Sequence, residues 1–116
     1  MLRRNLDLFR AAGLSPVEIR TSGGGARSAL WNQIKADVCG LPVVRSATEE
    51  TALLGDAILA GVAAGLFVSV AEGCQKMVRL TERILPGVMS GPYQDIYQRY
   101  CDLDDHLDAY WRRNYA

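Results

Sequence analysis

The sequence has no surplus of either charge and few cysteines. Thirteen Lys and Arg residues balance thirteen Asp and Glu residues, so the formal net charge of the 116-residue chain is zero. Because phosphate backbones are usually bound by basic surfaces, this balance argues against nucleic acid as the main partner. The spacing of Cys39, Cys74 and Cys101 is too wide for a zinc or redox motif, and we expect three buried, reduced thiols in a cytoplasmic protein.

The sequence also lacks a long apolar run. At the N-terminus, Asn5, Asp7 and Arg10 break up any apolar stretch that could form a signal peptide. The most apolar region, residues 52–71, is interrupted by Asp56, and only 12 residues separate Asp56 from Ser69. A run of that length is too short to span a bilayer, so we expect a core helix and no membrane partner.

The first half of the chain has a clear order of elements. Leu2, Leu6 and Phe9 share one helical face, and Gly13 ends that helix. The alternating pattern at 17–21 predicts a strand. Three glycines follow, and then an amphipathic helix with Leu30, Ile34 and Val38 on its apolar side and Asn32, Gln33, Lys35 and Asp37 on the other, ended by Gly40. Residues 41–45 are expected to form a short second strand.

The second half is mainly helical. Ser46 with Glu49, and Ser69 with Glu72, have the spacing of capping boxes, so helices are expected over 50–65 and after Ser69. Glycines within 52–65 indicate close packing, since glycine costs about 1 kcal/mol relative to alanine inside a helix. Residues 79–85 are ambiguous or extended. Pro86-Gly87 and Gly91-Pro92 bracket a loop before a terminal helix over 93–111.

Strand, loop, helix and strand in this order predict an α/β fold with a right-handed parallel crossover. A parallel pair alone is a poor sheet and normally belongs to a larger one. We therefore expect residues 1–116 to form a single, partial domain, helix-rich with a short parallel strand pair.

A strand that runs through glycines into a helix is suited to anion binding. Glycine lets the backbone approach a phosphate or ribose closely, and the helix start offers free N–H groups. Ser28 can cap the helix or donate to an oxygen, and Arg27 can add charge. The segment lacks both the dinucleotide fingerprint and the Gly-Lys-Ser/Thr of a P-loop. On the residues alone, nucleotide contact and a simple turn with positive φ are equally supported.

The wider string SGGGARSALWNQIKAD at residues 22–37 resembles the C-terminal domain of FGGY-family carbohydrate kinases, most closely the xylulokinase-like members. GLPVVR at 40–45 and ETALLGDA at 50–57 are also similar to the family. The resemblance implies the C-terminal lobe of an actin-like, ribonuclease-H-like ATPase fold, with ATP or ADP and Mg²⁺ in the cleft between two lobes.

The resemblance also implies which residues line the nucleotide. The expected nucleotide-binding residues are Gly24, Gly25, Ala26, Arg27, Ser28 and Ala29. Ala29 stands where some members present a polar side chain, so it offers only backbone or van der Waals contact.

The chemical machinery of such a kinase is absent from this sequence. The resemblance places the phosphate-binding motif and the sugar site in an N-terminal lobe, which is thus the expected partner, and it places the catalytic Asp upstream of this region. We expect no catalytic and no metal-binding residue here, and no phosphoryl transfer by the chain alone. Asp56, where the family has a small residue, is interpreted as structural. The acidic residues at 102–108 are expected on a solvated face, with His106 unsuited to catalysis.

Two alternatives stay open beside the kinase hypothesis. One is a stand-alone, non-catalytic module that binds nucleotide or oligomerises. The other is a helical interaction protein in which the glycines only turn the chain. Missing strands would leave apolar surface exposed, so the isolated chain is expected to self-associate as a homo-oligomer.

Overall fold

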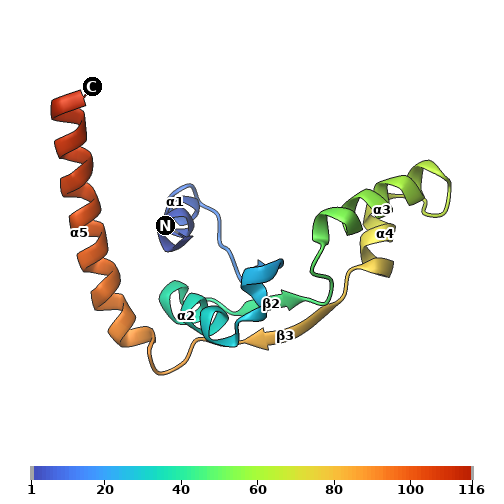
Figure 1. The fold of residues 1–116 in the computed structure, drawn as a ribbon, viewed down its shortest axis with the longest axis horizontal. Helices are drawn as coiled ribbons and strands as arrows, with labels where there is room; N and C mark the ends of the chain where they lie inside the picture. The colour runs from blue at the N-terminus through green and yellow to red at the C-terminus, as the bar shows by residue number, and fades with distance from the viewer. Residues whose placement is uncertain (1, 116) are drawn as a thin grey trace.

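The structure is a computed structural model that describes residues 2–115. Its elements are, in order, α1 (Leu2–Ala11), β1 (Ile19–Thr21), the 3-10 turn η1 (Gly24–Arg27), α2 (Ala29–Cys39), β2 (Val43–Ser46), α3 (Thr51–Ala63), α4 (Val70–Met77), β3 (Leu80–Ile84) and α5 (Ser90–Tyr115). A small sheet lies in the middle of the molecule, with α1, α2 and α5 toward one end and the α3–α4 pair at the other (Figure 1).

The sheet contains the predicted parallel pair and one further strand. β1 pairs with β2 in parallel, with Ile19 opposite Val43, and β3 pairs antiparallel with β2, with Val43 opposite Ile84. The segment 79–85, ambiguous or extended on its sequence, is thus a strand, and it separates the last two helices of the chain. The first strand is also shorter than predicted, because only residues 19–21 find partners on β2. Val17 remains 75% exposed.

The predicted amphipathic pattern of α2 was wrong on its polar side, and on its apolar side Leu30 is 71% exposed. Asn32 is 0% exposed and Asp37 is 5% exposed, whereas Trp31 is 51% exposed. The reason is that both polar side chains hydrogen-bond to loops that pack on the helix. Asn32 donates to the carbonyl of Ala26, and Asp37 accepts from the backbone N–H of Gly87. Burial of these groups is therefore compatible with a stable fold, since their polar atoms have partners.

Several predicted helix ends are confirmed, and one is not. Gly40 ends α2 with φ of 64°, and its N–H donates to Ala36 O. Ser69 caps α4 by accepting from the N–H of Glu72. The cap predicted at Ser46 was wrong, because Ser46 is the last residue of β2 and its Oγ accepts from Thr48 N instead. Helix α3 begins only at Thr51, with no side-chain cap.

Two other expectations also need correction. Gly91 and Pro92 lie in the first turn of α5, not at the edge of a loop. Proline is tolerated there because residues of the first turn have no helical partner for an N–H, so the missing N–H of proline costs no hydrogen bond. Of the three free cysteines, only Cys39 is buried, while Cys74 is exposed because its helix packs on one side alone. Burial raises the pKa of the Cys39 thiol.

The acidic stretch in α5 is only partly solvated as expected. Arg4 of α1 contacts Asp104 at 2.7 Å and Asp105 at 2.5 Å, which ties α5 to α1. Asp56 is exposed, in agreement with a structural interpretation. Within residues 2–115, no helix is both long and apolar enough to cross a membrane.

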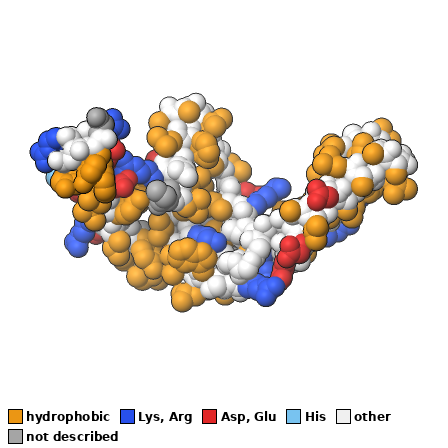
Figure 2. Space-filling model, turned by 45° about the horizontal axis from the view of Figure 1, so that its top comes forward, with side chains coloured by type: hydrophobic (Ala, Val, Ile, Leu, Met, Phe, Trp, Pro, Cys, Tyr) orange, Lys and Arg blue, Asp and Glu red, His pale blue; other side chains and the backbone are white. Residues whose placement is uncertain are grey.

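The molecule is more extended than a compact chain of its length. Its radius of gyration is 18.4 Å, against about 13 Å expected for a compact domain. The two ends seen in Figure 1 account for this, because α5 and the α3–α4 pair both project from the sheet. Apolar side chains cover much of the projecting α3–α4 pair (Figure 2), and Leu59, Leu66 and Val68 are among those exposed.

Close packing joins α3 to α4 through glycine. A Cβ built on Gly73 of α4 would lie 2.6 Å from Ile58 Cγ2 and 3.0 Å from a ring carbon of Phe67. A Cβ on Gly61 would also meet Phe67, at 2.6 Å. The predicted close approach is thus confirmed at Gly61. It is wrong for Gly55, which has no atom within 4 Å of such a Cβ, and for Gly65, which adopts φ of 75° after the helix.

We predict that Gly73→Ala destabilises the chain by about 1–3 kcal/mol, because the added methyl overpacks the contact with Ile58. The matched control is Gly55→Ala in α3, where space is open and the gain in helix propensity is expected to stabilise by up to about 1 kcal/mol. Urea unfolding followed by circular dichroism measures both. Equal effects of the two substitutions would contradict this packing account.

Candidate functional site

The glycine segment is a tight turn between β1 and α2. Gly23 adopts φ of 73° and ψ of −171°, a conformation that glycine alone adopts readily. Its carbonyl accepts from Ala26 N at 3.0 Å, which begins the 3-10 turn η1. Positive φ therefore explains why residue 23 is glycine, but it does not explain the glycines at 24 and 25. Both are exposed.

The backbone of Gly24 and Gly25 is open on its outer side. A Cβ built on Gly24 would meet no atom within 4 Å, and one on Gly25 would meet only Trp31 Cδ1, at 3.9 Å. A side chain would therefore fit the fold at either position, but it would fill the space next to the backbone. The open space allows a ligand to approach the main chain directly.

The other four predicted site residues are placed differently from one another. Ala26 is buried, so it can contribute only its backbone to a ligand. Ser28 is the N-cap of α2, since its Oγ accepts from Trp31 N at 3.1 Å. Its hydroxyl hydrogen remains available for donation. Arg27 and Ala29 are exposed.

Arg27 is paired with an acid from a separate loop. Its Nε donates to Glu49 Oε1 at 2.8 Å, and its Nη2 donates to Glu49 Oε2, which gives the two-pronged geometry typical of arginine with a carboxylate. The hydrogen bond raises the pKa of Arg27 and lowers the pKa of Glu49. Close by, Thr51 Oγ1 donates to Ser22 Oγ at 3.1 Å. These two contacts join the glycine turn to the start of α3.

Sequence reasoning missed Asn32 and Glu49 as residues of this region. Asn32 was assigned to the polar side of a helix, and Glu49 to a capping box. The pairing of Arg27 with Glu49 spans 22 residues of sequence, so no local pattern indicates it. Asn32 lies four residues after the helix cap, where a polar side chain is usually solvated. No group of three or more metal-binding side chains occurs among residues 2–115.

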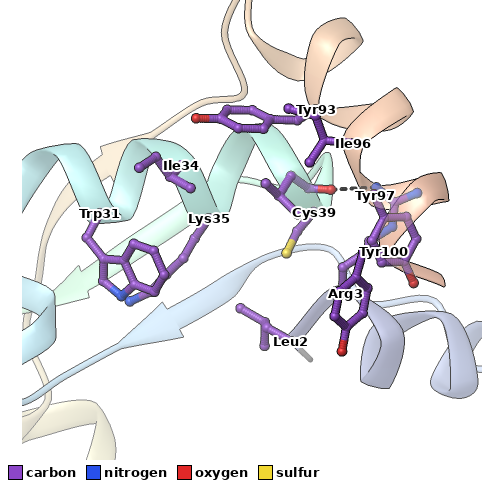
Figure 3. Close-up of a pocket in the computed structure, with 11 residues that line it drawn as sticks. Leu2, Arg3, Trp31, Ile34, Lys35, Cys39, Tyr93, Ile96, Tyr97 and Tyr100 are labelled. Atoms are coloured by element: carbon purple, nitrogen blue, oxygen red, sulfur yellow. Dashed lines mark hydrogen bonds between the residues drawn. The ribbon is translucent and has the colours of Figure 1, made fainter. Parts of the chain in front are cut away.

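A cavity of about 490 Å³ lies elsewhere, between α1, α2 and α5 (Figure 3). Its lining is mainly apolar and aromatic: Leu2, Arg3, Trp31, Ile34, Lys35, Val38, Cys39, Tyr93, Ile96, Tyr97 and Tyr100. Arg3 lies over the ring of Tyr97 and donates to Val38 O. Burial, together with a hydrogen bond to Asp7, raises the pKa of Tyr97. Trp31 and Lys35 line the cavity and also lie near the glycine turn, but none of the six predicted nucleotide-binding residues lines the cavity.

We predict that Arg27→Met raises the pKa of Glu49 toward the ordinary value of 4.5, because it removes the hydrogen bond that holds the carboxylate ionised. The pair's small contribution to stability is present above the ordinary pKa of Glu49. It is lost as the pH falls through the lowered pKa. A carbon-detected NMR titration of the Glu carboxyls measures this change.

Glu72 provides the internal control for that titration. Its pKa is lowered by Lys76 and by the N–H of Val68, neither of which contacts Arg27. Its titration should therefore be the same in Arg27→Met as in the parent chain. A Glu49 pKa that does not change in the variant would show that the ion pair is absent in solution.

Comparison with known proteins gives consistent matches. The sequence profile of the "FGGY family of carbohydrate kinases, C-terminal domain" matches residues 1–64. The chain is 42% identical over 107 residues to the xylulose kinase of Haemophilus influenzae, covering 85% of this chain and 20% of that protein. It is 39% identical over 103 residues to the autoinducer-2 kinase of Escherichia coli K12, covering 82% and 19%. The chain thus spans about a fifth of the length of these relatives.

Solved structures agree with the sequence matches. The crystal structure of the xylulose kinase from Rhodospirillum rubrum matches with a TM-score of 0.76 and 26% identity, covering 96% of this chain and 23% of that one. The ligand-bound xylulose kinase from Lactobacillus acidophilus matches with a TM-score of 0.75 and 25% identity, over 86% and 20%. The predicted α/β fold class, that of the actin-like ATPase lobe of such kinases, is confirmed by these matches.

Proposed function

Because this chain belongs to the FGGY family of carbohydrate kinases, of which it carries the C-terminal domain, we propose that it forms the adenosine side of an ATP site in a sugar kinase. The observation that carries the proposal is the open backbone of Gly24 and Gly25. This backbone follows the carboxyl end of β1, in a parallel pair with β2. In open α/β sheets, ligands bind in the crevice outside the carboxyl ends of the strands.

Each residue of the turn has a distinct role in this proposal. Gly24 and Gly25 admit the nucleotide to the main chain, and Ala26 supports them from the buried side. Ser28 keeps a hydroxyl hydrogen for a ligand oxygen, and Ala29 contributes van der Waals contact. Arg27 acts through its pairing with Glu49, which holds the turn against the start of α3. The set suits a neutral, flat group such as adenosine, because the one cation in the turn is already paired.

The rest of the reaction belongs to parts of the kinase outside this chain. We propose that an N-terminal lobe binds the sugar, supplies the catalytic base and holds the phosphates with Mg²⁺. When bound, ATP supplies the phosphoryl group, which goes to a sugar hydroxyl. The residues described here only position the nucleotide, so the chain alone does not transfer phosphate. A single partial domain over residues 1–116 and a cytoplasmic location are part of the same proposal.

A second candidate function is a non-catalytic module that binds nucleotide or self-associates. The observation that favours it is the apolar surface of the projecting ends. Leu59 of α3 is exposed, as are Leu66 and Val68 of the loop that joins α3 to α4. Leu103 and Trp111 of α5 are exposed too. Surfaces of this kind usually mark a contact with another protein or another part of the same protein.

We predict that ADP and ATP, with Mg²⁺, bind the purified chain weakly, with Kd in the micromolar to millimolar range, and that Gly25→Val abolishes the binding. The valine side chain fits the fold next to Trp31 but fills the space that the nucleotide needs. Calorimetric titration measures the affinities.

The matched control for that experiment is Gly91→Val in α5, which is also open to solvent and distant in sequence from the turn. It should bind ADP like the parent chain. Equal binding by the parent and by Gly25→Val would rule out the turn as the nucleotide site. Transfer of phosphate from ATP to xylulose by the chain alone would contradict the proposed division of labour.

We also predict that the isolated chain forms homo-oligomers through its projecting ends. Leu66→Asp combined with Val68→Asp should shift the population toward monomer, because charge is costly in an apolar interface. Sedimentation velocity measures the distribution, and the exposed control is Asp56→Ser. A clean monomer for the parent chain, without binding of an apolar dye, would refute self-association.

A further inference from the structure

One buried side chain connects the glycine turn to the helix behind it. Asn32 is 0% exposed, and its Nδ2 donates to the carbonyl of Ala26 at 2.8 Å. Its own backbone N–H donates to Ser28 O at 3.0 Å. A single residue therefore holds two carbonyls, one at the end of η1 and one at the start of α2.

These two contacts fix the joint between two kinds of helical turn. The last carbonyls of a 3-10 turn have no partner within the turn, and a buried carbonyl without a partner is unfavourable. The Asn32 side chain satisfies the carbonyl of Ala26, which is itself buried. Since the peptide plane of Ala26 is held in this way, the glycines before it are held in their exposed positions. An apolar side chain at position 32 could not do this.

The orientation of the Asn32 amide is supported by a nearby cation. Lys35 Nζ lies 3.5 Å from Asn32 Oδ1, the amide atom that does not contact Ala26. The positive charge favours the oxygen on its own side, which leaves the NH₂ group facing the Ala26 carbonyl. Lys35 also lies 5.6 Å from the centre of the Trp31 ring, the same ring that approaches Gly25. Trp31, Asn32 and Lys35 thus form one support beneath the turn.

We propose that Asn32 is a positioning residue for the nucleotide. It keeps the turn in the shape that presents Gly24 and Gly25 to adenosine, and it does not touch the nucleotide itself. This inference rests on the proposed function, because it assigns a support to the same site. Beyond that function, affinity for ADP then depends on a buried amide behind the turn.

The test compares Asn32→Leu with Asp37→Leu. Both positions are buried polar sites on α2, and each loses one bond to a loop, but Asp37 contacts Gly87 at the far end of the helix. Asn32→Leu should weaken ADP binding about tenfold, in line with the loss of one hydrogen bond. It should also speed amide hydrogen exchange at residues 24–28. Asp37→Leu should lower the melting temperature without changing the Kd for ADP.

A milder variant keeps the test decisive if Asn32→Leu does not fold. Lys35→Gln removes the cation beside the amide while leaving the core intact, and it should weaken ADP binding about threefold. Asn32→Asp, which keeps the shape but puts an acceptor opposite the Ala26 carbonyl, should weaken binding at least as much as Asn32→Leu.

The outcomes separate this inference from the proposed function. If Gly25→Val abolishes binding while Asn32→Leu and Lys35→Gln bind ADP like the parent chain, the role of Asn32 is refuted and the nucleotide site stands. If Asp37→Leu weakens binding as much as Asn32→Leu, Asn32 has a structural role only, and the inference is again refuted. If the parent chain binds no ADP at millimolar concentration, both fail together. Amide exchange at residues 24–28 then still shows whether Asn32 holds the turn.

Discussion

The rest of the structure depends on the buried polar side of α2. Asn32 near the start of the helix bonds to Ala26, and Asp37 near its end bonds to Gly87. Leaving either group buried without its partner would cost about 1–3 kcal/mol, so only one rotation of α2 satisfies both. That rotation fixes the glycine turn before the helix and the loop that leads from β3 into α5. Two loops far apart in sequence are thus set by one helix.

The C-terminal end of α2 also contacts two arginines of α1. Arg3 donates to Val38 O at 2.5 Å and Arg10 donates to Cys39 O at 3.5 Å, so two cations lie at the carbonyl end of the helix dipole. Asp7 binds Arg10 at 2.9 Å and accepts from the hydroxyl of Tyr97 at 2.7 Å, which brings α5 into the same network. Polar contacts therefore join all three helices around the cavity, whose lining is otherwise mainly apolar.

Local signals in the sequence predicted local structure well. Gly40, Ser69 and the glycine turn each act within a few residues, so the pattern alone contains the information needed for them. Several of the failures involve contacts between separate elements. Ser46 did not cap a helix because β3, which begins 34 residues later, pairs with its strand. Asn32 and Asp37 were assigned to solvent because their loop partners are invisible to helical periodicity. The order of elements predicted an α/β crossover, and the family resemblance supplied the actin-like ATPase lobe, which two short strands could not indicate.

The two parts of the candidate site differ in how they are formed. The glycine turn is held by contacts within this chain: positive φ at Gly23, the amide of Asn32, and the pairing of Arg27 with Glu49. The projecting ends instead keep apolar side chains exposed, among them Leu59 of α3 and Trp111 of α5. On the proposed function, the glycine turn that faces adenosine is therefore formed before the other lobe docks. A preformed binding surface lowers the entropic cost of binding nucleotide. We therefore expect this chain to determine the shape that is recognised, and the closed, two-lobed kinase to supply most of the affinity.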